Sequence, residues 1–211
     1  MNKLLVIIAS LLITVITCEA QEFRAGPLAG IGFSQVDGDA FAGYQKIGLN
    51  IGGFVSRSIA KDWDLQLDIA YIQKGSKVTP DVEKGKYDEY EIDLHYINFP
   101  LVARYQYKQF SFEGGLAIAV LFADDEIQNG QSIKGNDGVP PFQTIEYSTV
   151  FGVNYHFSER LWVNARMLYS LNRIRIPYNG EIPIYDPKPH WLSRKPGQYN
   201  NNIVFSMYYA I

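Results

Sequence analysis

The sequence has 211 residues, of which 47% are hydrophobic and 14% aromatic, and it carries a formal net charge of −3. This length fits one folded domain, and the apolar content excludes a disordered chain. The nearly balanced charge excludes the basic surface that nucleic-acid-binding proteins use, so no nucleic-acid partner is expected. Tyrosine and glycine are both abundant, at 15 and 18 residues, which is typical of β-structure at a membrane interface.

The first twenty residues have the three parts of a secretory signal peptide. Lys3 supplies the positive charge, residues 4–16 form the apolar stretch, and Cys18-Glu19-Ala20 is a small-x-small cleavage site. We therefore predict a signal peptide at residues 1–20 and a single mature domain at residues 21–211.

Cys18 is the only cysteine and allows a second interpretation, because lipoprotein signals also end at a cysteine. Thr17 is large for the position before a lipidated cysteine, which disfavours this alternative without removing it. Cleavage after Ala20 would leave a mature chain with no cysteine and no disulfide.

Beyond the signal peptide the hydrophobic residues alternate with a period of two, which is typical of β-strands with one apolar face. No apolar run approaches the roughly 20 residues of a membrane helix. In the five clearest segments, 28 of the 31 positions on one face are apolar. These segments are 95–107, 110–122, 145–155, 161–171 and 203–211. Three further strands are predicted at 23–34, 46–57 and 62–74, the first being the least regular because of Pro27 and several glycines.

The connections between these eight segments alternate strictly between short and long. The short ones are 58–61, 108–109 and 156–160, and the long ones are 35–45, 75–92, 124–143 and 173–200. This layout predicts an all-β fold, an eight-stranded antiparallel up-and-down transmembrane β-barrel in the outer membrane of a Gram-negative cell. Periplasmic turns, extracellular loops and two periplasmic termini follow, with outer-membrane lipid and lipopolysaccharide as surroundings.

A soluble lipocalin-like binding barrel would have the opposite polarity, so the faces must be compared. The face expected inside carries charged residues among small ones, whereas the other face places aromatic residues near the strand ends, as a membrane girdle requires. The aromatic residues are Trp63, Tyr71, Tyr105, Tyr107, Tyr155 and Tyr209. We therefore expect small or polar residues inside and apolar residues towards lipid.

The interior charges predict a polar network. If Lys108 and Gln109 form a two-residue turn, Arg104 lies opposite Glu113 on the inner face and can pair with it. Asn50 is expected to face Asp68. Because eight strands leave room only for side chains, these groups should plug the barrel, and a gate, a proton path or a narrow channel is the alternative. The predicted set is Asn50, Asp64, Asp68, Lys74, Arg104, Glu113, Glu146 and Arg166.

Four short motifs resemble the PorT-type outer-membrane β-barrel family of Bacteroidetes. They are Gly48–Phe54, Leu65–Gly75, Tyr96–Leu101 and Phe112–Gly115. The resemblance covers nearly the whole mature chain and implies an eight-stranded barrel, with some members acting as accessory factors of type IX secretion. One departure is the end of the chain, Tyr209-Ala210-Ile211, where such barrels usually end in phenylalanine; we expect Tyr209 to serve instead as the signal for barrel insertion.

Enzymatic and metal sites are weakly indicated. The element His156-Phe157-Ser158-Glu159 resembles the His-x-Ser element of lipid A deacylase barrels, but the topology places it in a periplasmic turn, away from outer-leaflet lipid. The histidines at 95, 156 and 190 have no zinc-ligand spacing. The acidic groups at 37–39 and 124–126 lack the regular spacing of a calcium loop. No cofactor is expected.

The last long connection is unusually apolar for a solvent-exposed loop, and Tyr178, Tyr185 and Trp191 are its aromatic residues. It is predicted either to fold over the barrel mouth or to bind a protein partner. The sequence therefore predicts a non-enzymatic outer-membrane barrel with a structural or accessory role, and secretion or surface assembly through its loops is the candidate process. A lipid-modifying enzyme, a narrow channel and a soluble binding barrel are the alternatives.

Overall fold

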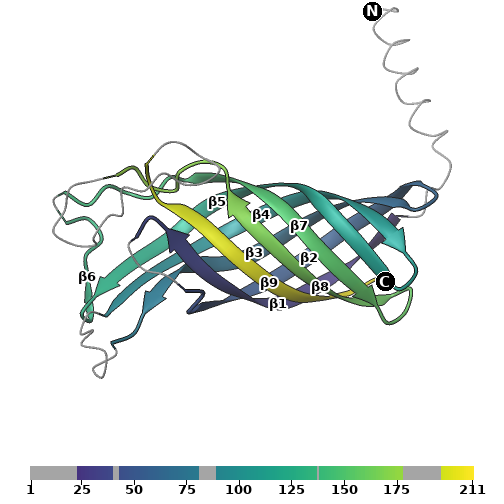
Figure 1. The fold of residues 1–211 in the computed structure, drawn as a ribbon, viewed down its shortest axis with the longest axis horizontal. Helices are drawn as coiled ribbons and strands as arrows, with labels where there is room; N and C mark the ends of the chain where they lie inside the picture. The colour runs from purple at the N-terminus through teal and green to yellow at the C-terminus, as the bar shows by residue number, and fades with distance from the viewer. Residues whose placement is uncertain (1–22, 40–42, 81–88, 137, 178–195) are drawn as a thin grey trace, which may run out of the picture.

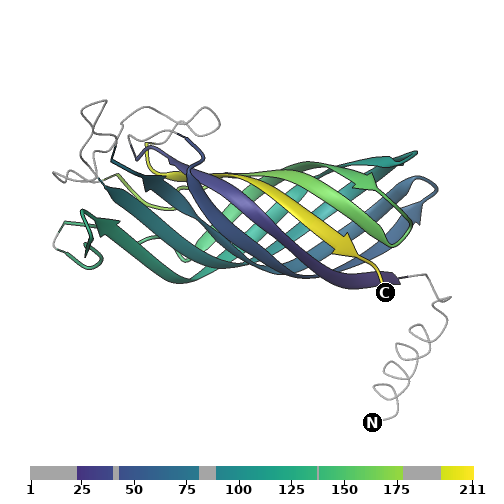
Figure 2. The same cartoon turned by 90° about the horizontal axis from the view of Figure 1, so that it is seen from below.

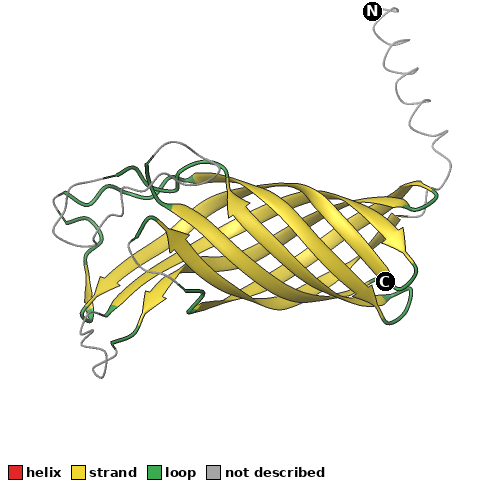
Figure 3. Cartoon of the chain, in the orientation of Figure 1, coloured by secondary structure: helices red, strands yellow, loops and turns green. Residues whose placement is uncertain are grey.

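The computed structural model describes residues 23–39, 43–80, 89–136, 138–177 and 196–211. The predicted signal peptide, including Cys18, lies outside these residues. Within them, no helix is long and apolar enough to cross a membrane. The described elements are strands joined by turns and loops (Figure 3). The strands are β1 (Phe23–Asp37), β2 (Lys46–Ala60), β3 (Trp63–Val78), β4 (Tyr90–Tyr107), β5 (Phe110–Gln128), β6 (Gln131–Ser132), β7 (Ile145–His156), β8 (Leu161–Ser170) and β9 (Tyr199–Tyr209).

Eight of these strands form a closed antiparallel barrel, as the sequence predicted. Neighbours follow the order β4-β3-β2-β1-β9-β8-β7-β5, and the pairing of β4 with β5 closes the ring (Figure 1). The two-residue strand β6 adds only a small hairpin at the end of β5. Pairing between the first and last barrel strands removes both free edges, which is how a β-structure satisfies its backbone in lipid.

The barrel has two unlike ends, which we call the turn end and the loop end. The turn end holds the short connections after β2, β4 and β7, and the start of β1 and the end of β9 also lie there (Figures 1 and 2). Two hydrogen bonds fasten the end of the chain, from Ile211 N to Ala25 O at 2.9 Å and from Ala210 N to Arg160 O at 2.7 Å.

The outer surface of the barrel is an apolar belt. Ile118 is 47% exposed, Leu101 49% and Phe151 63%, although each pairs with both neighbouring strands of the wall. A soluble barrel would bury such side chains, so the belt excludes the lipocalin-like alternative. Trp63, Tyr105, Tyr107 and Tyr209 are exposed at the turn end, where the sequence predicted aromatic residues.

Three strands are longer at the loop end than the sequence predicted. β3 reaches Val78, β4 begins at Tyr90 and β5 reaches Gln128, so much of the expected loops at 75–92 and 124–143 is paired strand. This β3-β4-β5 extension was missed because lysine, aspartate and glutamate interrupt the apolar alternation there. Its outer face projects beyond the apolar belt, and charged residues are therefore compatible with strand structure.

The interior is less polar than predicted. In the loop-end half, buried apolar side chains that include Tyr90, Ile92 and Leu94 form a core inside the barrel. A second buried cluster at the turn end contains Phe54, Trp162 and Tyr208. The expectation of small or polar inward residues is therefore wrong for these two layers: a closed interior can bury apolar side chains as readily as a soluble core does.

The predicted pairing of Asn50 with Asp68 is also wrong. Asn50 lies opposite Ile72, and Asp68 lies opposite Phe54. The reason is the turn: β2 continues to Ala60, which pairs with Trp63 across an irregularity after Ser58, so the register moves by four residues. An even shift keeps every side chain on its own face, and both polar residues remain buried inside.

Candidate functional site

The middle of the barrel holds a charge layer made of two arginines and two carboxylates, each at most 5% exposed. Arg166 donates from Nε to Glu113 Oε1 at 2.6 Å and from Nη1 to Asp68 Oδ2 at 2.8 Å. Arg104 Nη2 lies 3.5 Å from Glu113 Oε2. The two cations and two anions balance, as buried charges must.

Strand register explains how Arg166 reaches Glu113 although a strand lies between them. Gly152 on β7 is opposite Glu113 on β5 and opposite Arg166 on β8. A Cβ at Gly152 would lie 2.6 Å from Glu113 Oε1 and 3.0 Å from Ala165 O. The absence of a side chain at Gly152 therefore leaves the space in which the Arg166 guanidinium and the Glu113 carboxylate meet.

Neutral polar side chains complete the charge layer. Asn164 donates to Glu113 Oε1 at 3.0 Å and to Asn154 Oδ1 at 2.9 Å, and the Tyr208 hydroxyl donates to Asp68 Oδ2 at 3.0 Å. Arg104 also donates to the Gln66 amide oxygen. Asn154 donates to Glu113 Oε2 at 3.3 Å and Gln66 to Asp68 Oδ1 at 2.6 Å, so each oxygen of both carboxylates accepts at least one hydrogen bond from a neutral side chain.

An aromatic layer separates the charge layer from the turn end. Trp162 stacks on Tyr208 with ring centroids 5.4 Å apart and an interplanar angle of 8°, and Phe54 meets both rings edge-on. The Arg104 guanidinium lies 5.3 Å from the Trp162 ring centroid, as a cation–π pair. This aromatic layer fills the barrel on the turn-end side of the charge layer.

Asp64 forms the polar layer at the turn end. Its carboxylate accepts from Arg24 at 2.9 Å, from Gln106 at 2.8 Å and from Ser58 at 2.6 Å. Arg24 is partly exposed, so this pair lies where the interior meets solvent.

A third layer lies in the loop-end half. Lys74 donates to Glu146 Oε1 at 2.8 Å, and both side chains are fully buried. Glu146 also accepts from Ser148 at 2.6 Å and from Asn200 at 2.6 Å. The Lys74 ammonium lies 5.0 Å from the Tyr96 ring centroid. Both charges therefore have several partners within the apolar core.

The outermost interior layer joins the loop after β8 to the β3-β4-β5 extension. Arg175 makes a two-pronged pair with Glu126, with Nη1 2.9 Å from Oε1. The Tyr90 hydroxyl donates to the same carboxylate. The Arg175 guanidinium lies 3.7 Å from the Phe142 ring centroid. A cation–π contact and a bidentate pair together fix the residues that cover the mouth.

Within the polar layers described above, every charge has a counterpart. The cations are Arg24, Lys74, Arg104, Arg166 and Arg175, and the anions are Asp64, Asp68, Glu113, Glu126 and Glu146, so five positive charges meet five negative ones. Balanced charges between apolar layers plug the barrel. They offer no row of like charges that would attract a permeating ion.

The predicted network residues are thus all inside, but they belong to three separate layers. Asn50 lies among them and donates to the Ser206 hydroxyl at 2.9 Å. The predicted opposition of Arg104 and Glu113 is the observed register. Residues that sequence reasoning missed are Arg24, Gln66, Tyr90, Glu126, Gly152, Asn154, Asn164, Arg175, Asn200 and Tyr208. Most could have been found by extending the inward parity of each strand.

Beyond the belt, at the loop end, lies a different charged group, which we call the rim cluster: Lys46, Lys77, Glu91 and Asp93. Lys46 Nζ lies 2.6 Å from Glu91 Oε1 and 3.2 Å from Asp93 Oδ1, and Lys77 Nζ lies 2.8 Å from Glu91 Oε2. Burial raises the pKa of Glu91, but hydrogen bonds and charge from the two lysines outweigh it and hold the pKa below its ordinary value.

The His156-Phe157-Ser158-Glu159 element, which resembles that of the deacylases, leads from β7 into a turn. Ser158 Oγ accepts from the backbone N–H groups of Arg160 and Leu161 at 3.3 and 3.1 Å. The His156 ring instead meets Ser111, with Nε2 3.0 Å from Oγ, and Ser111 is fully buried. A buried hydroxyl cannot attack a lipid ester, so this pair has the composition of a catalytic dyad without the access.

The acidic loop residues are also engaged by protein groups. Asp124 lies 3.0 Å from Lys134, and Asp125 accepts from Ser132 at 2.8 Å. Among the described residues, no three histidine, cysteine or acidic side chains are grouped to hold a metal ion. Tyr178, Tyr185 and Trp191, the predicted partner-binding residues, lie outside the described residues.

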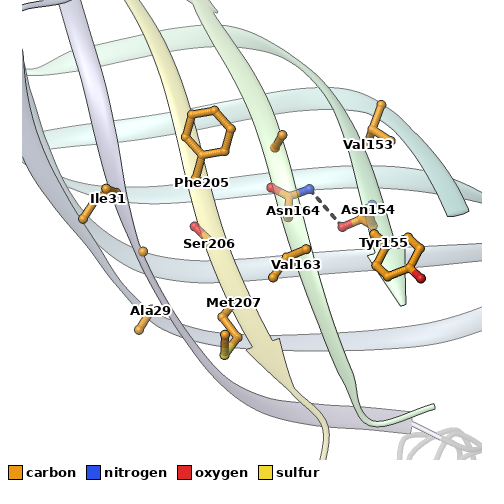
Figure 4. Close-up of a pocket in the computed structure, with 12 residues that line it drawn as sticks. Ala29, Ile31, Val153, Asn154, Tyr155, Val163, Asn164, Phe205, Ser206 and Met207 are labelled. Atoms are coloured by element: carbon orange, nitrogen blue, oxygen red, sulfur yellow. Dashed lines mark hydrogen bonds between the residues drawn. The ribbon is translucent and has the colours of Figure 1, made fainter. Parts of the chain in front are cut away.

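An outer depression lies on the β1-β9-β8-β7 wall and is almost entirely apolar, with a volume of about 520 Å³. Figure 4 shows Ile31, Phe205, Val163 and Met207 around it, while the Asn164–Asn154 hydrogen bond lies behind, on the inner face. Small residues opposite large ones, such as Ala165 beside Phe205, create the depression. It belongs to the lipid-facing belt.

A closed antiparallel barrel with an apolar outer belt and a charge-balanced interior defines an outer-membrane β-barrel protein. Residues 19–175 match the family model described as outer membrane protein beta-barrel domain, and the chain belongs to that family. No curated protein matches the sequence.

Two solved structures are similar to the chain. Neisserial surface protein A is 11% identical over 92% of this chain and 100% of its own, with a TM-score of 0.54, and at this identity the likeness concerns the fold alone. Ail, the attachment invasion locus protein of Yersinia pestis, is also 11% identical over 90% of this chain and 99% of its own, with a TM-score of 0.48.

Proposed function

We propose that this chain is a closed, non-enzymatic outer-membrane barrel that serves as a structural or accessory component, with its loop end presented outside the cell. The observation that carries this proposal is the filled interior, in which buried ion pairs alternate with apolar layers. A scaffold needs stability and an exposed surface for its partner. The filled interior provides the stability, and the β3-β4-β5 extension provides the surface. The turn end and both chain termini would then face the periplasm.

The surface available for a partner is the loop end. There the β3-β4-β5 extension rises beyond the belt and carries the rim cluster on an ordered sheet. Rigid strands can hold loops in one arrangement, which lowers the ordering cost of binding. The apolar segment 178–196 would supply the contact residues Tyr178, Tyr185 and Trp191.

A more specific form of the proposal follows from the resemblance to PorT-type barrels: an accessory role in type IX secretion or in surface assembly. The filled interior favours an accessory role over that of the conduit itself, because a conduit needs an open lumen. The partner in this form would be another envelope protein reached through the loops.

Two measurements test the proposal. In planar bilayers the purified barrel should add no stable conductance, and reproducible ohmic steps would overturn the closed state. For the accessory role, in-cell crosslinking from outer membranes should capture a partner with the full chain. A variant lacking residues 178–196 should still fold as a heat-modifiable barrel and lose that partner; unchanged capture would reject the loop as the contact.

A further inference from the structure

A small cavity lies inside the barrel, between the charge layer and the apolar residues on its loop-end side. Its lining is partly polar and partly apolar. The apolar side chains include Ile72 and Leu168, Pro100 also lines it, and the polar residues are Asn50, Asp68, Asn98, Asn164, Arg166 and Ser206. Its room for the centre of a water molecule is about 10 Å³. A site of this size takes on the order of one water molecule.

Two polar atoms of the residues lining this cavity have no hydrogen-bond partner within the described structure. They are Nη2 of Arg166 and Oδ1 of Asn98, and their residues are only 4% and 3% exposed. One is a donor on a cation and the other is an acceptor. Leaving such groups unsatisfied in the interior costs about 1–3 kcal/mol each, and more for the charged one.

The backbone supplies a third reason for a polar occupant. The β3-β4 ladder pairs Leu67 with Leu101 and resumes at Ala70 with Asn98, with no pairing between. The interruption faces Pro100, which has no N–H to donate. The backbone carbonyl of β3 that lies opposite Pro100 therefore needs a hydrogen-bond donor from another group, and this position is at the same cavity.

We propose that this cavity is a binding site for a single water molecule, which completes the charge layer. The water accepts a hydrogen bond from Arg166 Nη2 and donates one to Asn98 Oδ1. Its second hydrogen is free for the unpaired stretch of the ladder. An anion is not required, because the charge layer is already neutral, and a cation is repelled by Arg166.

The inference is independent of the accessory role, and it is consistent with a closed barrel. Ala70, Ile72, Leu168 and Val204 line the cavity and are buried. Because these apolar side chains border a space for only one water, the water cannot belong to a continuous chain of waters that reaches either end of the barrel. The water therefore acts as a structural bridge between β4 and β8, which carry Asn98 and Arg166.

A high-resolution crystal structure of the full barrel tests the site directly. Density for one water within hydrogen-bond distance of Arg166 Nη2 and Asn98 Oδ1 is expected, together with a long-lived water cross-peak to the Arg166 side chain by NMR. An empty cavity, or a direct bond between the two side chains, would overturn the proposal.

Substitutions then show whether Asn98 holds the water. Asn98→Leu should lose both the density and the cross-peak. The matched control is Asn202→Leu, because Asn202 is an equally buried asparagine that does not line the cavity. Asn202→Leu should keep the water. Retention of the water in Asn98→Leu, or its loss in both variants, would overturn the assignment of Asn98 as the residue that holds it. If Asn98→Leu does not fold, the wild-type structure alone decides.

Discussion

The charge layer in the middle of the barrel and the rim cluster at its loop end use the same chemistry in opposite surroundings. In the charge layer, Arg166 bridges two carboxylates that are shielded from solvent. In the rim cluster, Glu91 bridges two lysines, and the Lys77 side chain is 40% exposed. Bulk solvent can replace a lost partner at the rim but not in the middle of the barrel. Ion pairs of similar length should therefore differ greatly in their contribution to the free energy of unfolding.

The largest effect is expected when the charge layer loses its central cation. Arg166→Met should leave Glu113 and Asp68 buried without their main counterion and lower the free energy of unfolding by about 3–5 kcal/mol. Urea unfolding in lipid vesicles measures the change. Arg160→Met, at an exposed turn position, is the control and should be nearly neutral. Equal effects of the two substitutions would remove the contrast between the regions.

Substitution of Gly152 is the next test, because an added side chain there fills space without changing any charge. Gly152→Ala places a methyl group against the Glu113 carboxylate and should cost about 1–3 kcal/mol. Gly114→Ala is the matched control, because a Cβ there would meet only Phe151, at an ordinary 3.9 Å. A smaller cost at Gly152 than at Gly114 would mean that the charge layer adapts easily.

At the rim, removing a charge should change little. Lys77→Ala breaks one exposed ion pair and should cost no more than about 1 kcal/mol, because solvent screens such pairs. The same urea titration measures it. A loss as large as that of Arg166→Met would show that the rim cluster stabilises the barrel as strongly as the charge layer does.

The smallest effect is a local dependence on pH. Because the folded pKa of Glu91 lies below its ordinary 4.5, its ion pairs contribute fully above that pH and are lost as pH falls through the folded value. The protection factors for amide hydrogen exchange in residues 74–78 and 90–94, which compare the rate with that of an unfolded chain at the same pH, should therefore fall below about pH 4.5. Glu91→Gln should remove this dependence; if the fall in protection persists in that variant, another group is responsible.

Strand alternation and turn length, which are local features of the sequence, predicted the wall of the barrel. They did not predict the side-chain contacts across its interior. The two-residue turn was enough to place Arg104 opposite Glu113, because one hairpin sets that register. The contact between Glu113 and Arg166 spans three strands, so it depends on two registers and on the gap at Gly152. Asn50 was given the wrong partner because an irregularity near Ser58 moved the turn.

The apolar layers were missed for another reason. Tyr90, Ile92 and Leu94 alternate with Glu91 and Asp93, and a charged face was interpreted as a loop rather than as a strand outside the membrane. Alternation shows that one face differs from the other. It does not show which medium either face meets, because beyond the belt the outer face meets water instead of lipid.

Charge balance within each layer has a consequence for engineering. The pair Lys74–Glu146 and the group around Glu113 are separated by buried apolar residues that include Ile72 and Leu168, so neither neutralises the other. Each layer can then be redesigned as a unit, for example by exchanging Lys74 and Glu146 together for apolar residues of similar volume. The barrel can be treated as a stack of interchangeable modules within a constant wall.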